Sequence, residues 1–339
     1  MLALDALLAG SEEDLVAYIE ESGADIFVSQ EGVKNLHMAS SAITYRDMSL
    51  ASHAEGVTDA SPILYTTGIV KAEGAAILSY IIGYDPDESL GGPQETVAGT
   101  TDLRRDEVII DEAIARSQDL SLGDEVEIMG KAFTVVGLTR GLTNIVNSTS
   151  FITLQDFQEL RGGNSISYAL LRVSPNADAV QVAGAINQRN EDVLALSVTE
   201  FAREERQIIK DMSVEILNIM NMSGFLIGLA VTALTLYTST LRKRQEYGVL
   251  KAIGAGNRHL YLVVITQTVL SLALGFLTAV ALVWILGQVL PLAVPGMGLS
   301  LTQAGVSRVL SSALIIGVIA ALAPTYQISR LDPAQVFRG

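Results

Sequence analysis

Few side chains in this 339-residue chain could bind a metal or attack a substrate. There is no cysteine, which excludes disulfides, thiol nucleophiles and thiolate metal sites. His37 and His53 share one segment with Met38 and Met48, and such a set could bind a soft metal or haem. Surface histidines and packed methionines are more often structural, so we expect no metal site here.

Motifs for nucleotide and ester chemistry are also missing. No GxxxxGK[ST] loop occurs, so the chain is not expected to bind ATP through a P-loop. The nearest approach to GxSxG is DLSLG at residues 119–123, which lacks the first glycine and is more typical of a turn. With no catalytic constellation visible, we expect a chain that is not an enzyme and carries no cofactor of its own.

Composition divides the chain into two parts. Hydrophobic residues make up 49% and charged residues only 17%, against about 25% charged in ordinary soluble domains. Residues 1–215 hold 35 of the 37 acidic residues and 14 of the 22 Lys and Arg residues. This pattern argues against nucleic-acid binding and disorder. It predicts an acidic soluble part followed by a weakly basic part in a lipid bilayer.

Three uncharged runs are long enough to cross that bilayer. They predict spans near residues 216–241, 260–290 and 309–329. The first run, as a helix, would be about 39 Å long, against a hydrocarbon core of about 30 Å. Pro291, Pro295, Gly296 and Gly298 are expected to end the second span.

Basic residues orient these spans. Arg242, Lys243, Arg244, Lys251 and Arg258 lie between the first two spans, and the tail 330–339 is also basic. The positive-inside rule places residues 242–259 and the C-terminus in the cytoplasm and residues 1–215 outside. The opening MLALDALLAG is too short to span and lacks a basic signal region, so we expect a first membrane helix upstream.

Small residues recur at helix-packing spacing in the first two spans. Gly224 and Gly228 form a GxxxG pattern, and Gly275 with Ala279 repeats the spacing. Such a pattern allows close helix contact, within one chain or across a dimer. Small residues are also common in spans, and the two interpretations have equal weight.

The acidic part is predicted to be an α+β domain over residues 1–198. A capping box of Ser11 and Asp14 indicates the start of a short helix. Runs of β-branched and aromatic residues predict strands, and helices are expected between some of them. The predicted strands are ADIFVSQ, ILYTTGIV, AILSYIIGYD, EVIID, EVEIM, AFTVVGL, SFITL, SYALLRV and VLALSV. The turn-rich stretch 85–103 suggests two lobes.

A stalk helix over residues 199–215 is expected to join this domain to the first span. Thr199 is the predicted N-cap, and no Gly or Pro interrupts the chain before Gly224. An unbroken helix from Thr199 to Leu241 would be about 65 Å long. The alternative is a break near Ser213 that leaves a linker.

The segment between the first two spans could bind a partner. Tyr247, Leu250 and the small Gly248 and Ala252 could form a compact helix that enters a groove on another protein. The alternative is a basic turn at the membrane interface.

This segment resembles the FtsX/MacB-like family of ABC transporter permeases. The similarity lies in RQEYGVLKAIGAGNRHL after one span and APTYQISRLDPAQVFRG at the C-terminus. The outer part, with GADIFVSQEG and LSLGDEVEIMGKAFTVVG, looks like the family's extracytoplasmic core domain. The family normally has four spans, and the first is missing from this sequence.

The resemblance implies partners and a mechanism. It implies a homodimer or a pair of related permeases in a bacterial inner membrane, above two copies of an ABC ATPase that binds ATP and Mg²⁺. The matching coupling segment would dock on that ATPase, through Glu246, Tyr247, Gly248, Leu250, Lys251 and Gly254. ATP-driven motion would then reach the outer domain and export or extract a hydrophobic or amphipathic substrate. The alternative is a regulator that moves no substrate and acts on an external partner such as a cell-wall hydrolase.

Overall fold

The chain forms two compact units. The computed structural model describes residues 1–72, 75–143, 148–293 and 299–329. An α/β unit comprises Gly10–Met212 with Pro291–Gly298, and a helical unit comprises Met1–Ala9, Ser213–Leu290 and Leu299–Gly339. Helices α1 (Leu2–Glu21) and α6 (Val198–Arg242) each contribute residues to both units.

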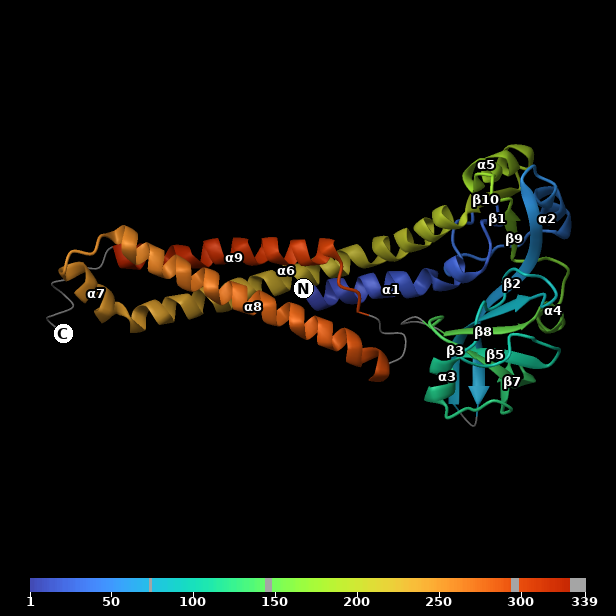
Figure 1. Ribbon diagram of the computed structural model, residues 1–339, viewed down its shortest axis with the longest axis horizontal. Coiled ribbons are helices and arrows are strands. Elements are labelled where there is room, and N and C mark those ends of the chain that lie inside the picture. Colours follow the sequence, from blue (N-terminus) through green and yellow to red (C-terminus); the bar gives the residue numbers. More distant parts are fainter. Residues whose placement is uncertain (73–74, 144–147, 294–298, 330–339) are drawn as a thin grey trace. The chain divides into compact units, whose positions relative to one another are not determined.

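The described part of the α/β unit forms a ten-stranded sheet (Figure 1). Its spatial order is β10-β1-β9-β2-β3-β8-β5-β7-β4, and β6 pairs with β2 and β7. Most pairs are antiparallel, whereas β3–β8 and β5–β7 are parallel. The strands are β1 (Ile26–Gln30), β2 (Val57–Ala72), β3 (Ala75–Tyr84), β4 (Ala98–Gly99), β5 (Glu107–Asp111), β6 (Glu125–Ile128), β7 (Lys131–Thr139), β8 (Ser148–Thr153), β9 (Tyr168–Val173) and β10 (Val193–Ser197).

The long strand β2 divides the sheet into two lobes. Its residues from Val57 to Ile63 pair with β9, and its residues from Leu64 to Ala72 pair with β3. We call β10, β1, β9 and the start of β2 the first lobe, with helices α2 (Tyr45–Ser52) and α5 (Ala179–Arg189). The remaining strands form the second lobe, with α3 (Glu112–Ser117) and α4 (Leu154–Arg161).

Three buried clusters hold this unit together. One lies in the first lobe under α2 and α5 and includes Val182 and Ile186. Another lies in the second lobe with Ile114 of α3 and Phe157 of α4. The third joins α1 and α6 to strands of both lobes; it includes Ile19, Phe201, Phe27, Ile82 and Phe151. The third cluster therefore contains residues of both lobes and of both helices.

Helices α1 and α6 also pair through charges in the α/β unit. Arg206 contacts Glu20 and Lys210 contacts Glu12, with an Nζ–Oε2 distance of 3.2 Å in the second pair. The partner number falls as the α6 number rises, so the helices run antiparallel. The stalk therefore contains two helices, where the sequence predicted one.

The helical unit has three helices long and apolar enough to cross a membrane. The candidate spans are Leu217–Arg242 of α6, Asn257–Leu290 of α8 and Gln303–Tyr326 of α9. Helix α8 runs from Asn257 to Ala293 and α9 from Gln303 to Ser329. Between α6 and α8 lies the short helix α7 (Arg244–Ala252). The prediction of an α+β domain followed by three membrane helices is confirmed.

Most predicted element types are also correct, but several boundaries differ. Helix α1 begins at Leu2, so the predicted start at Ser11 is wrong; the helix continues through the predicted cap. Helix α6 is unbroken, but Ser197 caps it rather than Thr199. The Ser197 hydroxyl accepts from the Glu200 amide at 3.3 Å, and the Glu200 carboxylate accepts from the Ser197 amide at 3.2 Å.

Other predicted boundaries meet the limits of the described residues. Helix α8 continues through Pro291 to Ala293, so that proline does not end it; Pro295, Gly296 and Gly298 lie outside the described residues. The predicted tail 330–339 also lies outside them. Helix α2 and strand β4 were not predicted. The predicted first-domain boundary at residue 198 compares with Met212 for the end of the α/β unit in this part of the chain.

Candidate functional site

Helix α7 is held against the helical unit by one aromatic side chain. Tyr247 is 3% exposed and packs with Leu260 and Val264 of α8. Gly248 is buried on the same side. A Tyr side chain this deeply buried positions the helix, and its ring surface is already covered by α8.

The opposite side of α7 carries exposed apolar side chains. Val249, Leu250 and Ile253 are 44%, 39% and 77% exposed, and Glu246 is exposed beside them. Positions i, i+3, i+4 and i+7 share one helix face, so these four residues form a single surface. We call them the α7 face.

A glycine ends the helix after this face. Gly254 has φ 99°, a left-handed conformation that side chains other than glycine rarely adopt. The Ala255 amide donates to the Leu250 carbonyl at 2.9 Å, which satisfies one of the last carbonyls of the helix. Gly254 therefore shapes the turn into α8.

The structure thus divides the six predicted contact residues into two groups. Glu246 and Leu250 lie on the exposed α7 face, whereas Tyr247 and Gly248 pack inward. Lys251 is half-buried, and Gly254 caps the helix. Val249 and Ile253 were missed by sequence reasoning, although their spacing from Glu246 and Leu250 was visible in the sequence.

The three glycines predicted to pack against other helices have different surroundings. A Cβ at Gly228 would lie 3.4 Å from Ile316 Cδ1 of α9, and one at Gly224 would lie 3.2 Å from Met1 Cγ. Both glycines of the GxxxG pattern thus face atoms of the same chain. A Cβ at Gly275 would meet no atom within 4 Å, so in a single chain this position is open.

The tightest glycine contact of the described helical unit was not predicted. A Cβ at Gly317 would lie 2.3 Å from Leu272 Cδ1, so α9 lies close against α8 here. A hydrogen bond from Gln267 Nε2 to Ser239 Oγ, at 3.0 Å, joins α8 to α6. These contacts fix the three long helices beside one another (Figure 1).

The first residues of α1 are built into the helical unit. Leu2 and Ala6 pack with Val283 of α8, and the Ser300 amide donates to the Ala6 carbonyl at 2.9 Å. The Asp5 carboxylate is 8% exposed and pairs with Arg308 Nη1 of α9 at 3.0 Å. Residues 1–9 therefore behave as part of the membrane helices rather than of the predicted outer domain.

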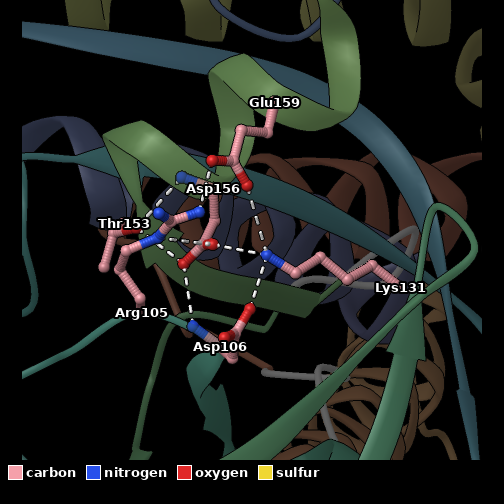
Figure 2. Close-up of polar contacts among 6 residues, drawn as sticks. All are labelled: Arg105, Asp106, Lys131, Thr153, Asp156 and Glu159. Carbon is pink, nitrogen blue, oxygen red and sulfur yellow. Dashed lines mark hydrogen bonds and ion pairs between the residues drawn. The ribbon is translucent and has the colours of Figure 1, made fainter.

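A dense charge cluster lies in the second lobe. Figure 2 shows Lys131 Nζ among three carboxylates, 2.5 Å from Asp106, 2.6 Å from Asp156 and 3.6 Å from Glu159. Arg105 contacts Asp156 and Glu159 from the other side. The cluster joins the segment just before β5, the start of β7 and α4.

Asp156 is the buried centre of this cluster, with 0% exposure. Burial alone raises the pKa of Asp156, but hydrogen bonds from Lys131, Thr153 and the Asp106 amide outweigh burial and lower the pKa below its usual value. Hydrogen bonds to Asp106 and Asp156 raise the pKa of Lys131. Both charges are therefore maintained near neutral pH.

The two histidines of the segment that also holds Met38 and Met48 each contact a protein group. His37 Nδ1 lies 2.9 Å from Glu205 Oε1, and the imidazole is nearly buried. Met38 is 60% exposed, and the His53 ring contacts the Ser49 carbonyl. Among the described residues no three His, Asp or Glu side chains converge as metal ligands.

Two family models match the sequence. The MacB-like periplasmic core domain matches residues 1–189, and the FtsX-like permease C-terminal domain matches residues 218–333. An uncharacterized ABC transporter permease of Mycobacterium tuberculosis is 24% identical, over 100% of this chain and 91% of the relative. HrtB of Staphylococcus haemolyticus, provisionally named a hemin transport system permease protein, is 24% identical over 72% of this chain and 66% of that protein.

A solved structure is also similar to part of the chain. The periplasmic region of MacB from Actinobacillus actinomycetemcomitans aligns with a TM-score of 0.42 and 11% identity, over 57% of this chain and 97% of that one.

Proposed function

Because this chain belongs to the FtsX/MacB-like family of ABC transporter permeases, we propose that it couples ATP hydrolysis by a partner ATPase to motion of its α/β unit. A permease of this family normally has no catalytic activity of its own, and its membership implies an ABC ATPase subunit as partner. The result of the motion is export or extraction of a hydrophobic or amphipathic substrate.

The α7 face carries this proposal. Val249, Leu250 and Ile253 are exposed apolar side chains on α7 and at its C-cap. This short helix lies between two candidate spans and begins at the last of three consecutive basic residues. Basic residues at the end of a span favour the cytoplasmic side, where an ATPase would lie. An apolar helix face entering a groove is a common mode of recognition between proteins.

Lipid and a second permease copy are the proposed surroundings of the long helices. Most apolar side chains of the candidate spans are exposed within the single chain, as they are where lipid or another helix covers them. The open Gly275 offers one place for a second copy, either identical or related. We place the complex in a bacterial inner membrane with the α/β unit outside and the C-terminus in the cytoplasm.

The substrate class is supported by one relative. HrtB bears a name for hemin transport, and hemin is an amphipathic molecule. In the proposed machine, apolar or amphipathic molecules are taken from the outer leaflet or from the α/β unit. A regulatory role would instead be favoured by co-purification of a cell-wall hydrolase and by ATPase activity that no apolar substrate stimulates.

The docking proposal is tested by placing a charge on the α7 face. Leu250→Asp and Ile253→Asp are each expected to reduce co-purification of the ABC ATPase at least tenfold, because burying an unpaired carboxylate in an apolar contact costs several kcal/mol. Gln245→Asp adds the same charge to the same helix at an exposed position beside the α7 face, outside its four residues, and is the matched control. ATPase binding by both face variants at the wild-type level would contradict the proposal.

A further inference from the structure

Helix α6 enters the α/β unit through an aromatic contact with the first lobe. Phe201, in its first turn, is fully buried and stacks on Phe27 of β1 at a centroid distance of 4.8 Å. Its ring also meets Tyr168 of β9 edge-on at 6.0 Å. The Val198 amide donates to the Asp25 carbonyl at 2.9 Å. The start of α6 is therefore fixed to the first lobe.

One turn later, α6 contributes a fully buried carboxylate. Glu205 is 0% exposed, and its two oxygens have different partners. Oε2 accepts from the Leu36 amide at 2.5 Å, and Oε1 lies 2.9 Å from His37 Nδ1. A buried carboxylate requires such partners because its desolvation is costly. Glu205 thus holds the loop that follows β1.

That loop is attached to both lobes. On the first lobe, the Tyr168 hydroxyl donates to the Asn35 carbonyl at 2.9 Å. On the second lobe, the His37 ring packs on Tyr80 of β3 at 4.3 Å and on Tyr65 of β2 at 5.9 Å. Tyr65 follows directly after the point where β2 changes its partner from β9 to β3.

The local charge supports this arrangement. Burial raises the pKa of Tyr168, and the negative charge of Glu205 raises it further. The phenol therefore remains protonated and keeps donating its hydrogen bond to Asn35. The loop 35–37 is held by a helix, by the first lobe and by aromatic rings of the second lobe, close to the place where the lobes join.

We propose that Glu205 is a positioning residue through which α6 sets the orientation of the second lobe relative to the first. The inference rests on the proposed ATP-driven motion of the α/β unit. A displacement of α6 moves Glu205 and with it Leu36 and His37. His37 then presses on Tyr65 and Tyr80, and the lobes turn about β2 near Ile63, where its pairing changes.

The cysteine-free chain allows this motion to be measured by site-specific spin labels. One label is placed at Val180→Cys, on α5 of the first lobe, and one at Glu125→Cys, on β6 of the second lobe; both positions are exposed. Distances are measured in the full permease bound to its ATPase, without nucleotide and with ADP and vanadate. In the background with wild-type Glu205, we expect the label distance to change with nucleotide.

Two variants remove the contact between Glu205 and His37 in different ways. Glu205→Met keeps a similar volume but removes both acceptors, and His37→Phe keeps a ring against Tyr80 but removes the bond to Glu205. Each is expected to abolish the nucleotide-dependent change in distance while ATPase binding stays at the wild-type level. The double variant should lose no more than either single one, since both act on one contact.

Conservative and neighbouring variants provide the controls. Glu205→Gln retains an oxygen acceptor and should keep most of the nucleotide-dependent change in label distance. If Glu205→Met abolished that change only by destabilising the fold, Glu205→Gln would not be expected to preserve it. Glu204→Met alters the half-buried neighbouring residue and should behave as wild type. Thermal melting confirms that each variant is folded, and His37→Phe remains informative if Glu205→Met does not fold.

The outcomes separate this inference from the proposed function. A permease that does not co-purify with any ABC ATPase overturns the proposed function and this inference with it. A permease that binds the ATPase but shows one label distance in both nucleotide states overturns the inference alone. A wild-type change in distance in folded Glu205→Met or His37→Phe also overturns it.

Discussion

Three of the buried carboxylates in the described residues pair with basic or imidazole side chains. Glu205 meets His37, Asp156 meets Lys131 and Asp5 meets Arg308. A buried carboxylate without a partner would cost several kcal/mol, so each pair constrains the two segments that supply it. The partners are 168, 25 and 303 residues apart, so these contacts join distant parts of the chain.

The Asp156 cluster leads to a prediction about pH. Because the pKa of Asp156 is lower in the folded state than in the unfolded state, its ionised form stabilises the fold above about pH 4. This contribution is lost as the pH falls through the folded-state pKa. Asp156→Asn is therefore expected to reduce the free energy of unfolding by about 3–5 kcal/mol at pH 7 and by less at pH 3.

Chemical denaturation of the purified chain in detergent at both pH values measures this difference. Glu127→Gln is the control, because Glu127 forms an exposed pair with Lys71 and such pairs contribute about 0–1 kcal/mol. A deficit of Asp156→Asn that is equally large at pH 3 and pH 7 would show that the charge of Asp156 is not the stabilising feature.

Close packing of the long helices depends on particular glycines. Gly317 lets α9 approach Leu272 of α8, whereas a Cβ at Gly228 would make an ordinary contact with Ile316 of α9. A Cβ at Gly275 would meet no described atom within 4 Å. A glycine in these spans is therefore either closely packed or open, and the position of the neighbouring helix decides which.

Leucine substitutions separate these roles. Gly317→Leu is expected to destabilise the helical unit by about 1–3 kcal/mol, because the new side chain must displace Leu272 or push α8 and α9 apart. Gly275→Leu should leave the melting temperature of the single chain unchanged. If a second permease copy packs on this position, the same variant should shift the dimer–monomer equilibrium towards monomer, which size-exclusion chromatography with light scattering detects. Equal melting temperatures for Gly317→Leu and the wild type would refute the packing role of Gly317.

Helices α1, α6 and α8 each have residues in both units. Helix α6 has 45 residues without a break, from the Ser197 cap to Arg242. Helix α1 begins beside α8 and α9 and ends at Glu21 among the residues of the α/β unit. A stiff helix transmits displacement along its axis, whereas a flexible linker would absorb it.

Breaking α6 should therefore uncouple the machine without dismantling it. Glu215→Pro removes a backbone donor from the middle of the helix and costs about 3 kcal/mol of local helix stability. We expect ATPase binding to persist and the nucleotide-dependent change between the lobe labels to disappear. Glu215→Ala keeps the helix and should retain the change. A normal change in the proline variant would mean that an unbroken α6 is not required.

Much of the architecture could be predicted because it depends on neighbouring residues. The uncharged runs, the alternating strands such as AFTVVGL and the basic start of the α7 segment are local patterns, and the spans, strands and short helix follow them closely. The predicted helix start at Ser11 is wrong because a good capping box also fits inside a helix when the preceding residues are packed.

The contact surface of α7 shows where local patterns stop being sufficient. Both Tyr247 and Leu250 were predicted from the sequence to contact a partner, because both are large and lie on a short helix. The fold places Tyr247 against Leu260 and Val264 and leaves Leu250 exposed. Only the position of α8 distinguishes the two, and that position is not encoded in the spacing within α7.

The order of charged, apolar and small residues by itself determined the candidate membrane spans, the mixed α/β part and the unbroken α6. These properties arise from periodicity and charge within a few turns of chain, whereas the family was indicated by the resemblance of two short motifs. Only the tertiary structure decided that Glu205 meets His37, that Gly317 rather than Gly275 is closed by a neighbouring helix, and that residues 1–9 join the membrane helices. Each of these depends on segments far apart in sequence being packed side by side. The role of a buried charge or of a glycine depends on the atoms that surround it, and local sequence does not specify those atoms.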